Sequence, residues 1–181
     1  MTIAGLYGMA DAGHGDPVAQ ARLLAEEGVA PIQLRCKGFT REQLREVLRA
    51  CRDVPGIVVN DDAVVASEFG CPVHLGQDDG RTSLPHGRST HTLDHVFAVT
   101  GATYIAFGPV FGTATKDSPW TPRGLDLLAQ AVRVSPRPVV AIGGIGTHNL
   151  AQVRATGVAG WAVIGAIWRS ADPLAAIRNL R

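Results

Sequence analysis

Eight short apolar segments alternate along the chain with stretches whose apolar residues recur at helical spacing. The segments span residues 5–9, 31–35, 57–60, 73–76, 86–89, 104–108, 138–142 and 161–164. Short apolar runs of this kind are typical of parallel strands that are covered on both faces. Strands that alternate with helices predict a parallel sheet with right-handed crossovers, and eight such units predict a closed (β/α)8 TIM barrel. An open doubly wound sheet is the alternative that the pattern leaves open.

Helical patterns fill the intervals between the segments, with one exception. They cover residues 17–28, 41–51, 63–69, 93–100, 124–134, 147–156 and 172–180. Asp16 before Pro17 is a helix-start signal, and Thr40 with Gln43 forms a capping box. Only residues 80–88 separate Asp79 from Ser89, which is too little chain for a helix and a strand. We therefore predict a compact barrel whose fourth helix is reduced to a turn or missing.

The composition favours one soluble domain covering residues 1–181. Hydrophobic residues make up 46% of the chain and charged residues 18%, so a buried core can form and disorder is disfavoured. The net charge of +1 gives no general attraction to nucleic acid or anionic lipid. Three cysteines without metal spacing, no signal peptide and no membrane-length apolar stretch lead us to expect a reduced, cytoplasmic protein. Homo-oligomerisation is left open.

Polar residues stand where the apolar segments end, and in a parallel barrel these ends form one rim with the active site. Gln33, Arg35 and Lys37 alternate along the second segment and therefore project to one side. If that side faces the interior, two cations and an amide converge on one ligand. The alternative is an edge strand with solvated charges.

Carboxylates follow the third and fourth segments. Asn60, Asp61 and Asp79 stand at neighbouring strand ends, where Asp61 and Asp79 can share a Mg²⁺ ion, because Mg²⁺ is held by a few carboxylates, waters and phosphate oxygens. Asp62 and Asp78 are second-ranked ligands. The alternatives are that Asp61 caps the third helix and that Asp79 starts a turn.

Two further segments suit phosphate groups. Thr113, Thr115 and Lys116 offer hydroxyls and an ammonium after the sixth segment. Gly144, with the glycine before it, and Gly165 end the last two segments, where barrels often bind phosphate through backbone N–H groups; tight turns are the alternative. A cationic, metal-bearing pocket beside a backbone-built pocket indicates an enzyme that joins two phosphorylated molecules.

These residues lie in motifs that resemble the thiamine phosphate synthase family, within the thiamine monophosphate synthase/TenI superfamily. The motifs occur in the family's order over nearly the whole chain: IQLRCK (32–37), VNDD (59–62), VHLGQDD (73–79), GRSTHT (87–92), GPVFGTATKD (108–117), AIGGI (141–145) and AVIGAI (162–167). The resemblance implies a transferase that joins hydroxymethylpyrimidine diphosphate to a thiazole phosphate and releases pyrophosphate. It implies a dissociative reaction, in which the diphosphate leaves before the thiazole nitrogen attacks.

The resemblance also implies roles for individual residues. The pyrimidine diphosphate would be bound by Gln33, Arg35, Lys37, Asn60, Ser89 and Lys116, of which Arg35, Lys37, Ser89 and Lys116 would assist catalysis. The metal ligands would be Asp61 and Asp79. The thiazole phosphate would be bound by Thr113, Thr115, Gly144, Ile164 and Gly165.

The chain departs from the family pattern in three ways: it is shortened around its first helix and at 80–88, Gly165 stands where the family usually has serine, and residues 6–11 only loosely match the family's first strand. A thiazole tautomerase is one rival, although the position where that group looks to carry a histidine is Pro109 here. A barrel that binds thiamine precursors without turnover is the other. We expect His74 to have a structural role and to point between strand and helix.

Overall fold

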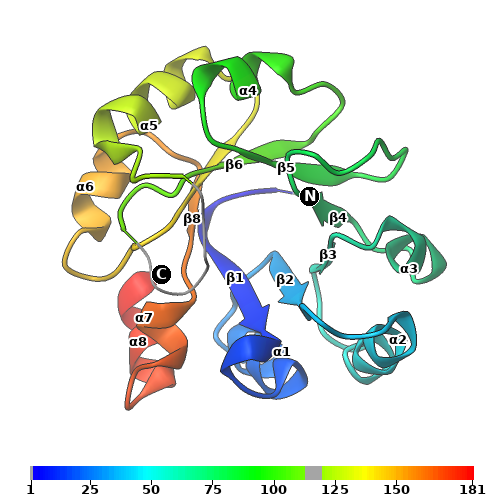
Figure 1. Cartoon of the computed structure of the whole chain (residues 1–181). Coiled ribbons are helices and arrows are strands. Elements are labelled where there is room, and N and C mark those ends of the chain that lie inside the picture. Colours follow the sequence, from blue (N-terminus) through cyan, green and yellow to red (C-terminus); the bar gives the residue numbers. More distant parts are fainter. Residues whose placement is uncertain (1, 113–119) are drawn as a thin grey trace.

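The computed structural model describes residues 2–112 and 120–181. Eight parallel strands form a closed ring in chain order, from β1 to β8 and back to β1. The strands are β1 (Gly5–Asp11), β2 (Ile32–Arg35), β3 (Ile57–Asn60), β4 (Val73–Leu75), β5 (His86–Thr90), β6 (Tyr104–Phe107), β7 (Val139–Ile142) and β8 (Gly160–Ala162). Figure 1 looks into this ring. The predicted barrel is confirmed, and the open sheet is excluded because β1 pairs with β8.

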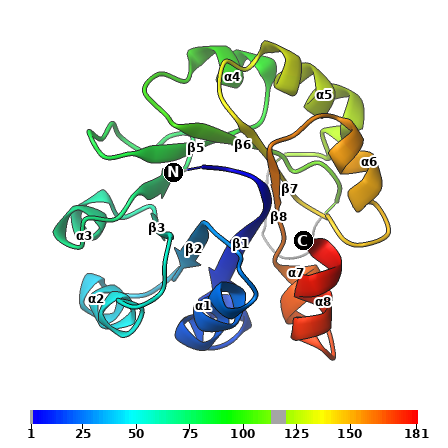
Figure 2. The ribbon, with the colours of Figure 1, turned by 180° about the vertical axis from the view of Figure 1, so that it is seen from behind.

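Helices lie around the outside of the ring, as Figure 2 shows from behind. They are α1 (Pro17–Glu26), α2 (Arg41–Ala50), α3 (Ala63–Glu68), α4 (Leu93–Ala98), α5 (Gly124–Val134), α6 (Leu150–Ala155), α7 (Gly165–Trp168) and α8 (Pro173–Leu180). The short α7 and a 3-10 turn, η1 (Ala12–His14), were not predicted. Of the helices in the described part of the chain, none has the length and apolar character needed to span a membrane.

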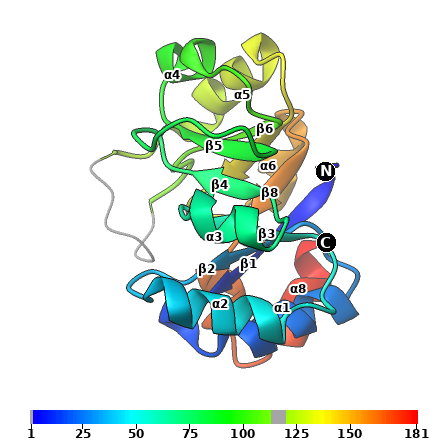
Figure 3. The same cartoon turned by 90° about the vertical axis from the view of Figure 1, so that its right-hand side faces the viewer.

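The helix expected between β4 and β5 is missing, as predicted. Residues 76–85 contain turns and bends but no helix, and only a loop covers this sector of the barrel (Figure 3). The Arg88 guanidinium holds the loop through three carbonyl oxygens. It donates to those of Gly76 at 2.8 Å, Asp79 at 2.6 Å and Gly80 at 2.9 Å. The half-buried Arg88 side chain therefore orders this segment, where a helix would be ordered by its own backbone hydrogen bonds.

Side-chain caps begin the helices where the sequence predicts them. Asp16 accepts from the N–H of Val18, and the capping box of α2 is complete. Asp62 caps α3 by accepting two backbone N–H groups and also pairs with Arg41. Burial raises the pKa of Asp62, but the backbone hydrogen bonds of α3 and the Arg41 guanidinium outweigh it, so the pKa lies below its ordinary value.

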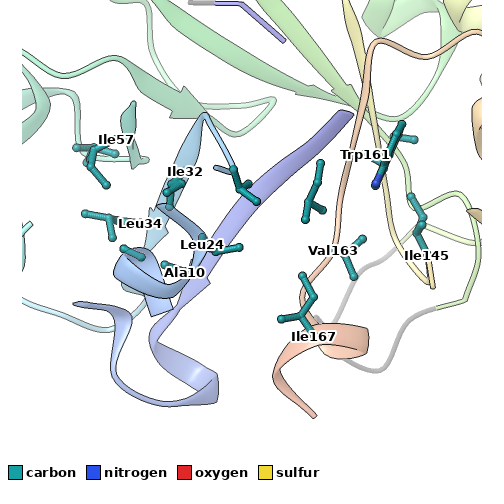
Figure 4. Close-up of a cluster of buried hydrophobic side chains, with 14 of the residues drawn as sticks. Ala10, Leu24, Ile32, Leu34, Ile57, Ile145, Trp161, Val163 and Ile167 are labelled. Atoms are coloured by element: carbon teal, nitrogen blue, oxygen red, sulfur yellow. The ribbon is translucent and has the colours of Figure 1, made fainter. Parts of the chain in front are cut away.

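The largest apolar cluster lies between the strands and the helices. Leu24 of α1, Ile32 and Leu34 are completely buried there, and Figure 4 shows Leu24 lying against the first two strands. Side chains alternate between the two faces of a strand, so the neighbours of these residues point into the barrel. Two tryptophans close gaps within the chain: the indole N–H of Trp161 donates to Leu180 O, and that of Trp168 to Met9 O, both at 2.7 Å.

The interior of the barrel has an apolar half and a polar half. An apolar cluster joins β1, β6, β7 and β8 inside the ring, and it contains Tyr7, Met9, Tyr104, Val140 and Ala162. The residues of β2 to β5 that line the cavity are instead polar; besides Arg35 they are Gln33, Asn60, His74 and Ser89. Eight alternating strands thus build a cavity with one hydrogen-bonding wall and one apolar wall.

Candidate active site

The cavity opens at the carboxyl ends of the strands, where the sequence predicted the site. Its lining includes many of the predicted residues: Gln33, Arg35, Asn60, Ser89, Gly144, Ile164 and Gly165. Thr113, Thr115 and Lys116 lie outside the described residues. These seven predicted residues therefore meet at one cavity although they lie far apart in the chain, whereas Lys37, Asp61 and Asp79 are not part of its lining.

Gln33 and Asn60 form the start of the polar wall. They come from adjacent strands, and Gln33 Nε2 donates to Asn60 Oδ1 at 3.2 Å. Gln33 is buried, so the alternative of an edge strand with solvated polar residues is wrong for this position. Each amide fixes the orientation of the other, and together they offer donors and acceptors to a planar polar ring.

Arg35 is held by a residue that sequence reasoning did not select. Its guanidinium donates to Asp11 Oδ2 at 2.7 Å, because the register of β1 and β2 sets Asp11 opposite Arg35. Asp11 is only 1% exposed and also accepts from the N–H of Gly13 at 2.8 Å. The available signal was an aspartate at the end of the first strand. A buried carboxylate thus orients the cation that faces the cavity.

Lys37 pairs with Asp61 at the ends of β2 and β3 instead of lining the cavity described. Asp61 has a φ of 65°, an uncommon conformation for a residue with a side chain. Its N–H donates to His74 O at 2.8 Å. Because Asp62 and not Asp61 caps α3, the capping alternative for Asp61 is wrong, and its carboxylate pairs with Lys37 at the strand ends instead.

Asp79 lies in the loop after β4, and its environment matches the turn alternative. Its Oδ2 accepts from the N–H of Gly76 at 2.6 Å, and its own N–H donates to Gly76 O at 3.3 Å. In residues 2–112 and 120–181 there is no group of three or more His, Cys, Asp or Glu side chains suited to a metal. A Mg²⁺ site made by Asp61 and Asp79 would have only two carboxylates and is therefore not tested by that absence, so the metal site stays a prediction.

His74 points into the barrel, so our expectation that it lies between strand and helix is wrong. Its Nδ1 is 2.8 Å from Tyr104 Oη and its Nε2 is 3.1 Å from Ser89 Oγ. Tyr104 Oη also bonds Tyr7 Oη at 2.6 Å. The reason is strand alternation: the outward neighbours of His74 in β4 are the apolar residues that contact the helices. All four polar side chains border the cavity.

Gly143 and Gly144 stand where nothing larger fits. Their φ angles are 102° and 64°, and a Cβ on Gly144 would lie 2.5 Å from Gly112 O and 2.7 Å from Phe111 Cβ. The tight-turn alternative therefore accounts for these glycines. It is compatible with phosphate binding, because the same close packing leaves their backbone beside the cavity that Gly144 lines.

His91 is a second histidine on the cavity wall that sequence reasoning did not select. Its Nδ1 lies 2.5 Å from Gly108 O, and its ring stacks on Trp120 with a centroid distance of 5.0 Å.

Cys36 does not belong to the site and packs against the outer core. Burial raises the pKa of its thiol to about 12, so Cys36 is not a nucleophile near neutral pH.

Comparisons with known proteins agree with this arrangement. A family model described as thiamine monophosphate synthase matches residues 6–167. A thiamine-phosphate synthase from Anaeromyxobacter dehalogenans is 39% identical over 99% of this chain and 87% of its own, and one from Neisseria meningitidis is 38% identical over 86% and 84%.

A solved structure is also similar over almost the full length. Thiamine phosphate pyrophosphorylase from Pyrococcus furiosus superposes with a TM-score of 0.87 at 30% identity, covering 98% of this chain and 93% of its own. A structure of 3-hexulose-6-phosphate synthase, at 18% identity and a TM-score of 0.67, shares the fold. The chain therefore belongs to the thiamine monophosphate synthase family.

Proposed function

We propose that this enzyme is a thiamine phosphate synthase, which joins hydroxymethylpyrimidine diphosphate to hydroxyethylthiazole phosphate. The bond between the pyrimidine methylene carbon and the diphosphate oxygen breaks, and a bond forms from that carbon to the thiazole nitrogen. The products are thiamine phosphate and pyrophosphate. The observation that carries this proposal is the convergence of Gln33, Arg35, Asn60 and Ser89 on one cavity in a chain of this family.

The two walls of the cavity suit the two parts of the reaction. The amides of Gln33 and Asn60 and the hydroxyl of Ser89 would bind the pyrimidine, whereas Ile164, Gly165 and Gly144 would bind the thiazole phosphate. Gln33 is buried and the other two are half-buried, so the wall would limit the access of water to the reacting carbon and make hydrogen bonds there stronger than in water. The reaction requires no nucleophilic side chain from the protein, because the thiazole nitrogen is the attacking atom.

Cations would stabilise the leaving diphosphate as its negative charge grows. Arg35 is oriented by Asp11 before substrate arrives, so little reorganisation is needed in the transition state. Lys37 lies at the same rim, where it pairs with Asp61. Its ammonium would leave that carboxylate and contact the phosphate oxygens when the substrate binds. Lys116 is proposed to act with them.

Mg²⁺ is the proposed cofactor, with Asp61 and Asp79 as ligands. The donor set fits: two carboxylates from consecutive strand ends supply hard oxygen ligands, and Mg²⁺ takes its remaining positions from water and phosphate. When bound, the ion would neutralise charge on the departing diphosphate. We propose a cytoplasmic location and small-molecule substrates as the partners, without nucleic acid or membrane, and we leave homo-oligomerisation open.

The first test is pyrophosphate release by the purified protein with both substrates and Mg²⁺. Turnover is expected, whereas binding of the thiazole phosphate without any release would favour the non-catalytic barrel. A thiazole tautomerase would convert its substrate without the pyrimidine diphosphate. That reading is disfavoured because Pro109, which lines the cavity, has no group able to transfer a proton.

The second test compares Asp79→Asn with Asp78→Asn. Loss of a metal ligand removes several kcal/mol of transition-state stabilisation, so Asp79→Asn should lower turnover on the order of 10²-fold and weaken Mg²⁺-dependent pyrophosphate binding in calorimetry. Stability in urea should barely change, since Asn can still accept from Gly76. Equal losses of folding and turnover, or equal effects of both variants, would leave Asp79 as a turn residue only.

A further inference from the structure

Three residues form one row across the interior of the barrel. In the strand register, His74 of β4 lies opposite Gly87 of β5, and Gly87 lies opposite Tyr104 of β6. A Cβ on Gly87 would lie 2.0 Å from Tyr104 Cζ, so the tyrosine ring occupies the space above the glycine. The missing side chain lets residues from two non-adjacent strands meet, with His74 Nδ1 2.8 Å from Tyr104 Oη.

The row continues at both ends. Tyr104 Oη bonds Tyr7 Oη of β1 at 2.6 Å, and His74 Nε2 bonds Ser89 Oγ of β5 at 3.1 Å. Tyr7, Tyr104 and His74 are buried, with exposures of 2%, 1% and 8%. A continuous chain of three hydrogen bonds therefore leads from a buried phenol to the serine hydroxyl that we assign to the pyrimidine.

The buried end sets the direction of every bond in this chain. Burial raises the pKa of both phenols, so each keeps its hydrogen. In the described residues, the bond to Tyr104 Oη is the one side-chain hydrogen bond of Tyr7 Oη. If Tyr7 accepted there, its own hydrogen would be buried without an acceptor, at a cost of about 1–3 kcal/mol. Tyr7 therefore donates to Tyr104.

The remaining directions follow one after another. Tyr104, whose oxygen accepts from Tyr7, donates its hydrogen to His74 Nδ1. The ring then carries its hydrogen on Nε2 and donates to Ser89 Oγ. Ser89 accepts from the histidine, and its own hydrogen is directed at the cavity.

We propose that His74 and Tyr104 are positioning residues that hold Ser89 as a hydrogen-bond donor, and that this donor selects a heteroaromatic ligand with a ring nitrogen acceptor. Gly87 makes the arrangement possible because its missing side chain leaves room for the Tyr104 ring. The inference rests on the proposed function for the identity of the ring as a pyrimidine. It predicts that a ring-nitrogen acceptor is favoured next to Ser89 over an exocyclic N–H group, because an N–H group cannot accept the serine hydrogen.

The tautomer of His74 tests the direction of the chain without any substrate. Two-dimensional ¹⁵N NMR of the wild-type protein, with the His74 signals assigned by their loss in His74→Asn, should show the hydrogen on Nε2. Tyr104→Phe removes the donor to Nδ1 and should give a mixture of tautomers. Tyr7→Phe removes an equally buried hydroxyl but leaves Tyr104 as the donor, so the Nε2–H tautomer should persist.

Kinetics test the consequence for the ligand. Tyr104→Phe should raise KM for the pyrimidine diphosphate about tenfold, the size expected for one misdirected hydrogen bond, while KM for the thiazole phosphate stays within twofold, about 0.4 kcal/mol. Two pyridine analogues of the pyrimidine diphosphate, each with C–H in place of one ring nitrogen, locate the acceptor. The analogue that lacks the nitrogen next to Ser89 should bind the wild type about tenfold more weakly than the other analogue does. In Ser89→Ala the two analogues should bind equally well.

Two results would overturn the inference. One is an Nδ1–H tautomer of His74 in the wild type; the other is an equal effect of Tyr7→Phe and Tyr104→Phe on both tautomer and KM, which would indicate packing alone. Failure of the proposed function looks different. A protein that shows the Nε2–H tautomer and its response to Tyr104→Phe, but releases no pyrophosphate, keeps the donor chain and loses the assigned reaction.

Discussion

Replacing Asp11 with asparagine should separate the orientation of Arg35 from its charge. Asp11 is 1% exposed, and its two oxygens accept from Arg35 at 2.7 Å and from the N–H of Gly13 at 2.8 Å. Asparagine has the same shape but only one acceptor oxygen. Whichever way the amide is turned, either the guanidinium or the Gly13 N–H loses its acceptor.

The magnitude follows from those two bonds. A hydrogen bond that involves a charged group contributes about 1.5–3 kcal/mol, so the free energy of unfolding in urea should fall by about that amount. The same loss lets Arg35 leave the geometry that suits a leaving diphosphate, and 1.36–2.7 kcal/mol of transition-state stabilisation corresponds to about 10- to 100-fold in kcat/KM. The decrease should appear with the pyrimidine diphosphate as the varied substrate.

Asp16→Asn is the matched control. Asp16 is exposed and caps α1 by accepting from a backbone N–H, and asparagine caps as well as aspartate, so stability and turnover should both be retained. If Asp11→Asn lowered stability while kcat/KM stayed at the wild-type value, the carboxylate would support the fold only. If neither quantity changed, the reasoning from the buried ion pair would be refuted.

Two further predictions concern the frame of the site. Asp62→Ala should cost about 1 kcal/mol of unfolding free energy through the lost cap of α3, whereas Asp62→Asn should keep the cap. Because the folded pKa of Asp62 is lowered, its carboxylate stabilises the fold above about pH 4. That contribution is lost as pH falls through the folded pKa, so Asp62→Asn should be less acid-sensitive than wild type in urea titrations at pH 7 and pH 3. Gly144→Ala should destabilise the protein and raise KM for the thiazole phosphate, since its Cβ would meet Gly112 O at 2.5 Å. Gly38→Ala, with a φ of 83° and no neighbour within 4 Å, should show only the cost of its backbone conformation, about 1–2 kcal/mol, and equal effects of the two substitutions would contradict the close packing.

Several elements were predictable because their signals are local. Asp16 with Pro17, and Thr40 with Gln43, begin helices at the residues that the structure shows. The absence of a helix in 80–88 followed from chain length alone. Polar residues after apolar segments indicated the rim, since all strands of a parallel barrel end on one side.

Neighbouring identical residues show where local signals stop. Asp61 and Asp62 both follow β3, and either could have capped α3 by sequence. Asp61 has a φ of 65° and pairs with Lys37, while Asp62 accepts the N–H groups of the helix. His74 was misplaced for a similar reason: in a strand of three residues, VHL, alternation is too short to show which face is the interior.

The sequence by itself determined the eight strands and the longer helices, and that the carboxyl ends of the strands carry the polar residues, because each of these depends on patterns within a few residues of chain. It favoured a closed barrel by the number of strand–helix units, and the pairing of β1 with β8 excluded the open sheet. Only the tertiary structure decided that Asp11 holds Arg35 and that Gly87 lets His74 meet Tyr104. Those pairings depend on the register between strands that lie many residues apart, and a one-residue slip of register would turn every side chain of a strand to the opposite face.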